Sequence, residues 1–176
     1  KGYYAYGFKD HRSKGMAEVE YSFNKKEYLP REFPKHSVSG TFMYDVMAPT
    51  DKFLKTDKDN VFTSFKTTTV DQMMYVRNVA LKYERETEIG FKTTLELKNT
   101  NDEPTGKLVY MKNDASRTIV PDITTSEASL TLRYAPGETF INTKQRRIPV
   151  SFDAPVFTLS HTAGFKGVLG GDYNYN

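Results

Sequence analysis

The sequence predicts an all-β protein whose strands form an antiparallel meander within a transmembrane outer-membrane β-barrel. The first observation is an alternation of apolar and polar residues with period two, which recurs in segments of about ten residues. These segments are longer than the ~5 to 6 residues of an ordinary strand and match the ~9 to 11 residues that cross a bilayer. A further observation is an aromatic content of 14%, made up of Tyr and Phe. Tyr is frequent near the segment ends, where barrels carry aromatic girdles.

The strand candidates follow one another along the chain. Tyr4, Tyr6 and Phe8 indicate a first, short strand. Clear two-faced alternation then predicts longer strands over 16–24, 36–46, 89–97 and 128–134. Shorter strands are indicated by VFTSFKT at 61–67, KLVYMK at 107–112 and DAPVFTLSHT at 153–162. These candidates account for most of the eight or nine strands that we expect, within roughly the length of one domain.

Residues 75–87, YVRNVALKYERET, fit two structures. Val76, Val79, Ala80 and Tyr83 have the spacing of one face of a helix. We favour a strand, because RETE could form the turn into the next predicted strand at residue 89. The helix stays open as an alternative.

Polar segments separate the candidates and are expected to be connectors. Among them are KNTNDEPTG at 98–106 and APGETFINTKQRR at 135–147. Pro, Gly, Asn and Asp concentrate in these segments, as their turn chemistry favours. No linker or repeat divides the chain, so residues 1–176 are expected to form one partial barrel domain.

In a barrel, the polar face of each strand lines the interior and the apolar face meets lipid. The expected lumen-facing residues are Glu18, Glu20, Asp45, Lys92, Glu96 and Arg133. The same alternation also fits a soluble, secreted β-sandwich that binds a glycan or a protein partner. Its apolar faces would meet across about 10 Å, so a structure with Tyr and Phe on the outside would exclude it.

Composition removes several other classes of protein. Only 38% of residues are hydrophobic, the mean hydropathy is -0.63, and no apolar run is long enough for a membrane-spanning helix. The chain has no Cys, which excludes disulfides, thiolate metal sites and a Cys nucleophile. A net charge of +3, from 25 basic and 22 acidic residues, is too balanced to indicate a nucleic-acid surface.

The phrases LRYAPGE, RRIP, DAPVFTLSHT and GDYNYN carry a family resemblance. The sequence resembles an outer-membrane family of Gram-negative bacteria in which a carboxypeptidase-regulatory-like domain precedes a C-terminal β-barrel without established activity. The resemblance implies that the chain is an interior part of that barrel, preceded in the full protein by a signal peptide and periplasmic domains. It also implies a non-catalytic scaffold or a component of outer-membrane transport or protein assembly, with no cofactor. The expected partners are outer-membrane lipid, lipopolysaccharide and other outer-membrane or periplasmic proteins.

A second, more distant similarity connects the chain to the barrel-assembly and secretion-pore superfamily. The inward loop of that superfamily carries an Arg-Gly pair between an aliphatic and an aromatic residue. GFKGVLGG offers Lys166 and Gly167, followed by Val168 in the place of the aromatic residue. We therefore do not transfer the function of that superfamily.

Catalytic and metal chemistry find little support. An outer-membrane hydrolase would need Ser160 beside His11 or His36, because the adjacent His161 must point to the opposite face of a strand. The three His residues lack the spacing of metal ligands. DKFLKTDKDN departs from the order of a calcium-binding loop and is expected to be a solvated connector.

Two features near the C-terminus suggest parts of a barrel. Lys144, Arg146 and Arg147 are expected at the membrane rim, where basic side chains meet headgroups or lipopolysaccharide phosphates. Gly164, Gly167, Gly170 and Gly171 lack phosphate-binding spacing and predict a turn or an inward loop instead.

Overall fold

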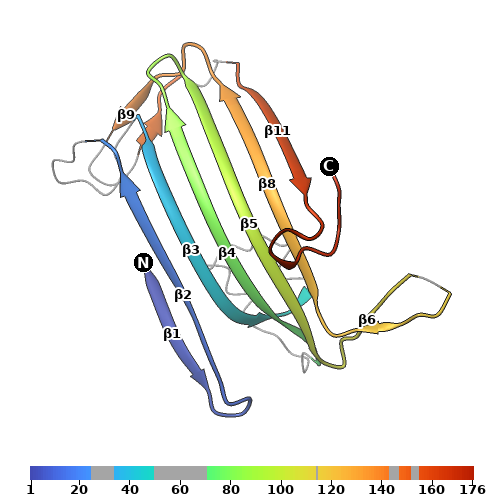
Figure 1. Cartoon of the computed structure of the whole chain (residues 1–176). Helices are drawn as coiled ribbons and strands as arrows, with labels where there is room; N and C mark the ends of the chain where they lie inside the picture. The colour runs from blue at the N-terminus through green and yellow to red at the C-terminus, as the bar shows by residue number, and fades with distance from the viewer. Residues whose placement is uncertain (25–33, 50–70, 114, 143–146, 152–154) are drawn as a thin grey trace.

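The computed structural model describes residues 1–24, 34–49, 71–113, 115–142, 147–151 and 155–176. Within them, seven strands form one antiparallel sheet in the order β1-β2-β3-β4-β5-β8-β11 (Figure 1). Their bounds are β1 Gly2–Gly7, β2 Arg12–Ser22, β3 His36–Met47, β4 Gln72–Glu86, β5 Phe91–Gly106, β8 Ile123–Tyr134 and β11 Phe157–Gly164. The all-β, antiparallel prediction is therefore confirmed.

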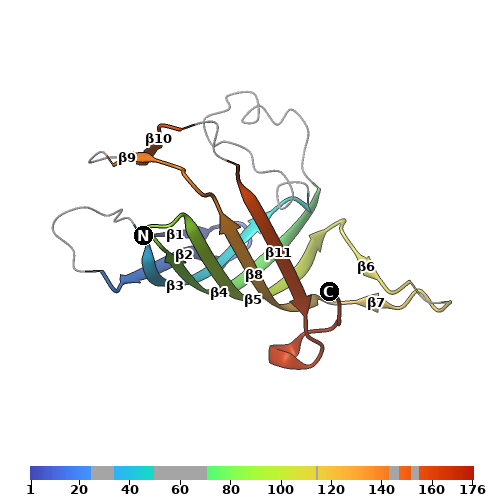
Figure 2. The ribbon, with the colours of Figure 1, turned by 90° about the horizontal axis from the view of Figure 1, so that it is seen from above.

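Two small hairpins and one short turn complete the described chain. Strands β6 (Tyr110–Met111) and β7 (Ile119–Val120) form a hairpin between β5 and β8. Strands β9 (Phe140–Asn142) and β10 (Arg147–Pro149) form another between β8 and β11. Figure 2 shows that the two hairpins project beyond the sheet on different sides. A 3-10 turn, η1 (Val168–Gly170), follows β11.

The ambiguous segment is a strand, and the helical alternative is wrong. Residues 75–87 fall largely in β4, which pairs with β3 and β5 along its length. Strand β5 also runs further than predicted, because residues 98–106 continue it instead of forming a connector. Pro104 is tolerated there because β5 pairs with β8 only as far as Asp102, which leaves the remainder of β5 with one ladder.

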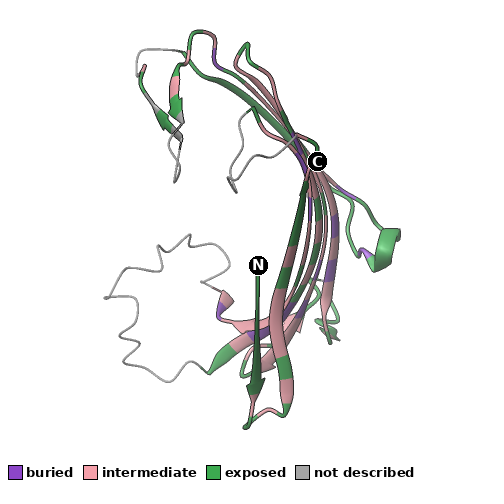
Figure 3. Cartoon of the chain, turned by 90° about the vertical axis from the view of Figure 1, so that its left-hand side faces the viewer, coloured by how far each residue is buried: buried purple, intermediate pink, exposed green. Residues whose placement is uncertain are grey.

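The sheet is bent and open. Seen from its side, it has a concave and a convex surface (Figure 3). The outer strands β1 and β11 are not hydrogen-bonded to each other, so the described strands form an open sheet and do not close into a barrel. Among the described residues, no helix is long and apolar enough to span a membrane.

The apolar core is small, as expected of a single layer. Among the described residues, the buried apolar side chains are Ala48, Met74, Tyr75, Val76 and Ala135. Several polar side chains are as deeply buried, including Ser37 and Glu84. Within the described part of the sheet, burial is therefore shared between apolar and polar side chains.

Candidate functional site

The convex surface of the sheet is apolar. Directly paired residues share a face, so the register defines rows of side chains across the strands. One row joins Val19, Gly40, Leu81, Leu97, Ala128 and Ala163, and the row above it joins Tyr21, Val38, Tyr83, Leu95, Leu130 and His161. Asn99 and Ser126 lie on the same face and bond the chain around η1, which lies on the convex side in Figure 3. We call this surface the convex apolar face.

Its large side chains are exposed. Val19 is 73% exposed, Leu159 is 67% exposed, and Leu81 and Leu97 are each about half exposed. A contiguous apolar surface of this extent marks a contact with a partner or a membrane. The opposite face contains Ser37, Ser39, Glu84, Thr100 and Asp102, which are all buried. Burial therefore favours the polar side chains, which crowd on the inner surface of the bend.

The lower edge of the apolar face moves along the strands as the sheet is crossed. On β8 the polar residues Ser126 and Thr124 follow below Ala128, whereas on β3 the apolar residues continue from Phe42 through Tyr44 to Val46. The apolar residues therefore reach further down β3 than β8.

Arginine and aromatic side chains border this face. On β4, Arg77 and Arg85 are exposed on either side of Val79, Leu81 and Tyr83. Neither arginine is among the site residues predicted from the sequence, although the alternation in RNVALKYER contains both. At the upper border, Phe91 lies 6.5 Å from Tyr134 and Tyr21 lies 5.2 Å from Phe23, measured between ring centroids. Such a border suits the polar headgroup region of a bilayer.

The concave surface collects the polar residues that the sequence singled out. The register places Glu18, Glu20, Asp45, Lys92, Glu96 and Arg133 on this one face. Glu20 bonds Lys35 at 3.0 Å, and Asp45 accepts a hydrogen bond from Tyr3. Arg133 forms a two-point contact with Glu138, at 2.7 and 2.8 Å. We call this surface the concave polar face.

Glu84 is the centre of the largest charge cluster on the concave polar face. It is 6% exposed and contacts Lys35 at 2.7 Å, Lys92 at 2.9 Å and Lys82 at 3.3 Å. Three ammonium groups around one buried carboxylate compensate the cost of removing that carboxylate from water. The cluster joins β4 and β5 to the residue that precedes β3. The local sequence pattern does not predict this cluster, because Lys35 lies 49 residues from Glu84 in the chain.

A second polar cluster closes the lower rim of the sheet. Arg12 donates to both carboxylate oxygens of Glu103 at 2.9 Å and to the Tyr44 hydroxyl, while its guanidinium lies 4.2 Å from the centre of the Tyr75 ring. The Tyr75 hydroxyl donates to Asp10 at 2.6 Å. These contacts tie the β1–β2 turn to β3, β4 and β5.

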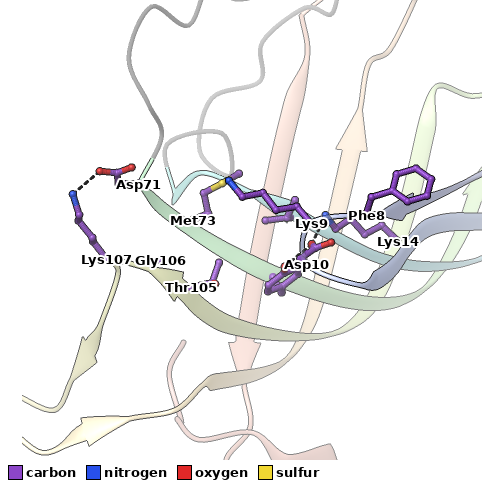
Figure 4. A pocket seen from close by; sticks show the side chains of 12 residues that line it. Phe8, Lys9, Asp10, Lys14, Asp71, Met73, Thr105, Gly106 and Lys107 are labelled. Atoms are coloured by element: carbon purple, nitrogen blue, oxygen red, sulfur yellow. Dashed lines mark hydrogen bonds and ion pairs between the residues drawn. The ribbon is translucent and has the colours of Figure 1, made fainter.

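An open pocket of about 700 Å³ adjoins this cluster. Figure 4 shows Asp71 paired with Lys107 at one end of the pocket, and Asp10 with Lys14 toward the other. The Lys14 and Tyr75 contacts hold the pKa of Asp10 well below its usual range. Both carboxylates carry a lysine partner, so the pocket edge is a set of ion pairs and not an unpaired charge.

The glycine-rich segment after β11 turns back across the sheet on its convex side. Gly167 and Gly170 have φ values of 81° and 83°, which L side chains rarely adopt. The Ser126 hydroxyl donates to the Val168 carbonyl, and the Asp172 carboxylate accepts from the Thr124 amide at 2.7 Å. The segment thereby bonds the lower part of β8, which β11 does not cover. The other glycines lie at its ends: Gly164 pairs with Tyr175, and the Gly171 amide donates to the Val168 carbonyl.

The remaining predicted residues divide between described and undescribed parts of the chain. Lys144 and Arg146 lie outside the described residues, as does the segment 61–67. Arg147 begins β10. DKFLKTDKDN also falls outside the described ranges.

The residues considered for catalysis lie on different faces. Ser160 bonds the Thr131 hydroxyl at 2.7 Å on the concave polar face, whereas His161 pairs with Leu130 on the convex apolar face. His36 is also on the convex side, where its Nε2 atom lies 3.2 Å from the Tyr83 hydroxyl. Across the described ranges, His, Asp and Glu form no group of three or more that could hold a metal ion.

Comparison with known proteins gives one match. No curated protein and no solved structure matches the chain. Residues 1–176 match the C-terminal domain of a family of unknown function, DUF5686. Because that match covers the whole length, the chain belongs to the DUF5686 family, in its C-terminal domain.

Proposed function

We propose that this chain is part of an integral outer-membrane β-barrel that acts as a non-catalytic scaffold or as a component of outer-membrane transport or protein assembly. The main support for this proposal is the distribution of side chains, which is the reverse of that in a water-soluble protein. Apolar residues are exposed on the convex apolar face, and charged residues are packed on the concave polar face. Lipid would meet the first surface, and a wet or filled lumen would meet the second.

The open edges of the sheet support the same proposal. Strands β1 and β11 each have one side without a strand partner in the sheet. Lipid offers no hydrogen bonds to such backbone groups, so a membrane-embedded sheet has to be closed by further strands. The Tyr175–Gly164 bridge already extends the ladder by one pair on the free side of β11.

The charged concave polar face supports a role in which the lumen is occupied or wet. Glu84 with its three lysines and Lys98 with Glu127, at 3.1 Å, are paired within this face. Such ion pairs remain stable next to water or next to a polar plug. We propose lipid and lipopolysaccharide as contacts of the outside, and other outer-membrane or periplasmic proteins as partners. A preceding carboxypeptidase-regulatory-like domain belongs to the same proposal.

Labelling along β4 tests the membrane assignment, because this chain has no Cys of its own. Single Cys residues are introduced at Val79, Ala80, Leu81 and Lys82 in the full-length protein, expressed in its native membrane. We expect the even positions to react with a small aqueous maleimide, and the odd positions to stay unlabelled until detergent dissolves the membrane. Equal aqueous labelling at all four, or recovery of the protein as a soluble periplasmic species, would contradict the proposal.

A further inference from the structure

A groove on the convex apolar face lies between the sheet and the glycine-rich segment. Its volume is about 770 Å³, within the range of small-molecule sites. The floor consists of apolar side chains from three strands, and the far wall comes from the segment around η1. The apolar lining residues are Val79, Leu81, Leu97, Ala128, Phe165, Val168 and Leu169.

The far wall is held in place by polar contacts. The Asn99 amide donates to the Leu169 carbonyl at 3.2 Å and to the Ser126 hydroxyl at 2.8 Å. The Leu169 side chain is nevertheless 77% exposed, and its backbone has a φ of 46°, in the left-handed region. Such a conformation costs energy in a non-glycine residue. The segment thus forms an apolar wall of the groove, and the Leu169 side chain on this wall stays exposed.

Two cations line the groove, Lys98 and Arg77. Lys98 forms an ion pair with Glu127 at 3.1 Å, and the register places both of these side chains on the concave polar face. Arg77 is exposed, and no ion pair connects it to another residue in the described parts of the chain. Its direct neighbours across the ladders are Tyr44 and Asn101, neither of which carries a negative charge. An unpaired guanidinium at the end of an apolar groove is complementary to a phosphate attached to a hydrocarbon chain.

We propose that this groove binds one glycerophospholipid. The lipid phosphate would contact Arg77. One acyl chain would lie against Leu81 and Leu97 on the floor and against the wall formed by Val168 and Leu169. This inference rests on the proposed membrane function. A single unpaired cation and a groove of this volume suit one phosphodiester lipid better than lipopolysaccharide, which carries more phosphate groups and more acyl chains. Arg77 also lies at the border of the convex apolar face, where a headgroup would lie.

The full-length protein, purified in detergent micelles, provides the test. Phosphatidylglycerol, phosphatidylethanolamine and purified lipid A are added separately, and bound lipid is counted by native mass spectrometry. We expect one retained glycerophospholipid per protein. Arg77→Gln is expected to weaken its retention roughly tenfold, the effect of losing one charge-assisted contact. Ala128→Phe, which fills the groove floor, is expected to reduce retention as well.

Arg85→Gln is the matched control, because Arg85 is an exposed arginine on the same strand and face but does not line the groove. It should leave retention unchanged. Equal retention in Arg77→Gln and wild type, equal loss in Arg77→Gln and Arg85→Gln, or a preference for lipid A would overturn the proposal. The β4 labelling experiment separates the two hypotheses. Alternating labelling without lipid retention would reject the groove alone, and uniform aqueous labelling would reject the membrane function as well.

Discussion

The same strands carry different side chains on the two faces of the sheet. On β4, Val79, Leu81 and Tyr83 project to the convex side, while Lys82 and Glu84 project to the concave side. Val79 and Leu81 are 46% and 50% exposed, whereas Glu84 is 6% exposed. In water, such a sheet would leave its hydrophobic surface unused and bury its charges at a cost. Contact of the convex apolar face with lipid, as proposed above, would account for this difference.

The difference between the two faces is tested most directly by placing a charge on the convex apolar face. Leu81→Lys lies in the middle of the exposed row on β4. If lipid covers this row, we expect a loss of about 2 to 4 kcal/mol in the free energy of unfolding, the cost of Lys near the midplane of a bilayer. Guanidinium titration of the full-length protein in lipid vesicles measures it.

Thr41→Lys is the control for this substitution. Thr41 follows Gly40, the row neighbour of Leu81, but belongs to the concave polar face and pairs with Glu18. We expect a change below about 1 kcal/mol, because the new charge lies near an acidic side chain. A similar small effect of Leu81→Lys would show that its row faces water.

A smaller effect is expected at the centre of the concave polar face. Glu84→Gln removes the charge that balances Lys35, Lys82 and Lys92. The three lysine side chains are 30 to 39% exposed, so solvent screens part of the loss, and we expect a destabilisation of about 1 to 2 kcal/mol. The same titration applies.

The comparison for Glu84 is Glu96→Gln, a substitution on the same face of the adjacent strand. Glu96 is opposite Lys82 in the ladder, yet it is not within ion-pair distance of a basic residue among those the structure describes. We expect its effect to be under half of that of Glu84→Gln. Equal effects would mean that the cluster around Glu84 contributes nothing particular to the fold.

The sequence predicts the strands and their faces better than it predicts the contacts between distant strands. Period-two alternation is a local signal, and it identified the long strands and the polar set from Glu18 to Arg133. It failed at 98–106, where turn-forming residues belong to β5 because β4 supplies a ladder for them. The Arg12–Glu103 contact joins residues 91 positions apart. No local pattern encodes such a pair, since it depends on how the strands are ordered.

The wall of the proposed groove gives a third, smaller test. Asp172→Ala removes the acceptor for the Thr124 amide, and we expect a loss of about 1 kcal/mol, localised to the end of β8. Hydrogen exchange at Thr124 and Ser126 should accelerate while exchange in β4 stays unchanged. Asp172→Asn keeps an acceptor oxygen and should preserve most of the protection. Global acceleration in Asp172→Ala would show that the segment stabilises the whole sheet and not only its convex edge.

The smallest effect concerns pH at the lower rim, where the two faces meet. The pKa of Asp10 is held below its ordinary value by Lys14 first and by the Tyr75 hydroxyl second. A depressed pKa stabilises the folded state at a pH above the unfolded value of about 3.9, and that contribution is lost as the pH falls through the folded value. Protease cleavage in the β1–β2 turn should therefore increase below about pH 4 in wild type. Asp10→Asn should be cleaved faster already at neutral pH and should lack this acid-dependent step, because it cannot ionise. If the acid step persists in Asp10→Asn, another carboxylate controls the rim, and Glu103, which holds Arg12, is the next to substitute.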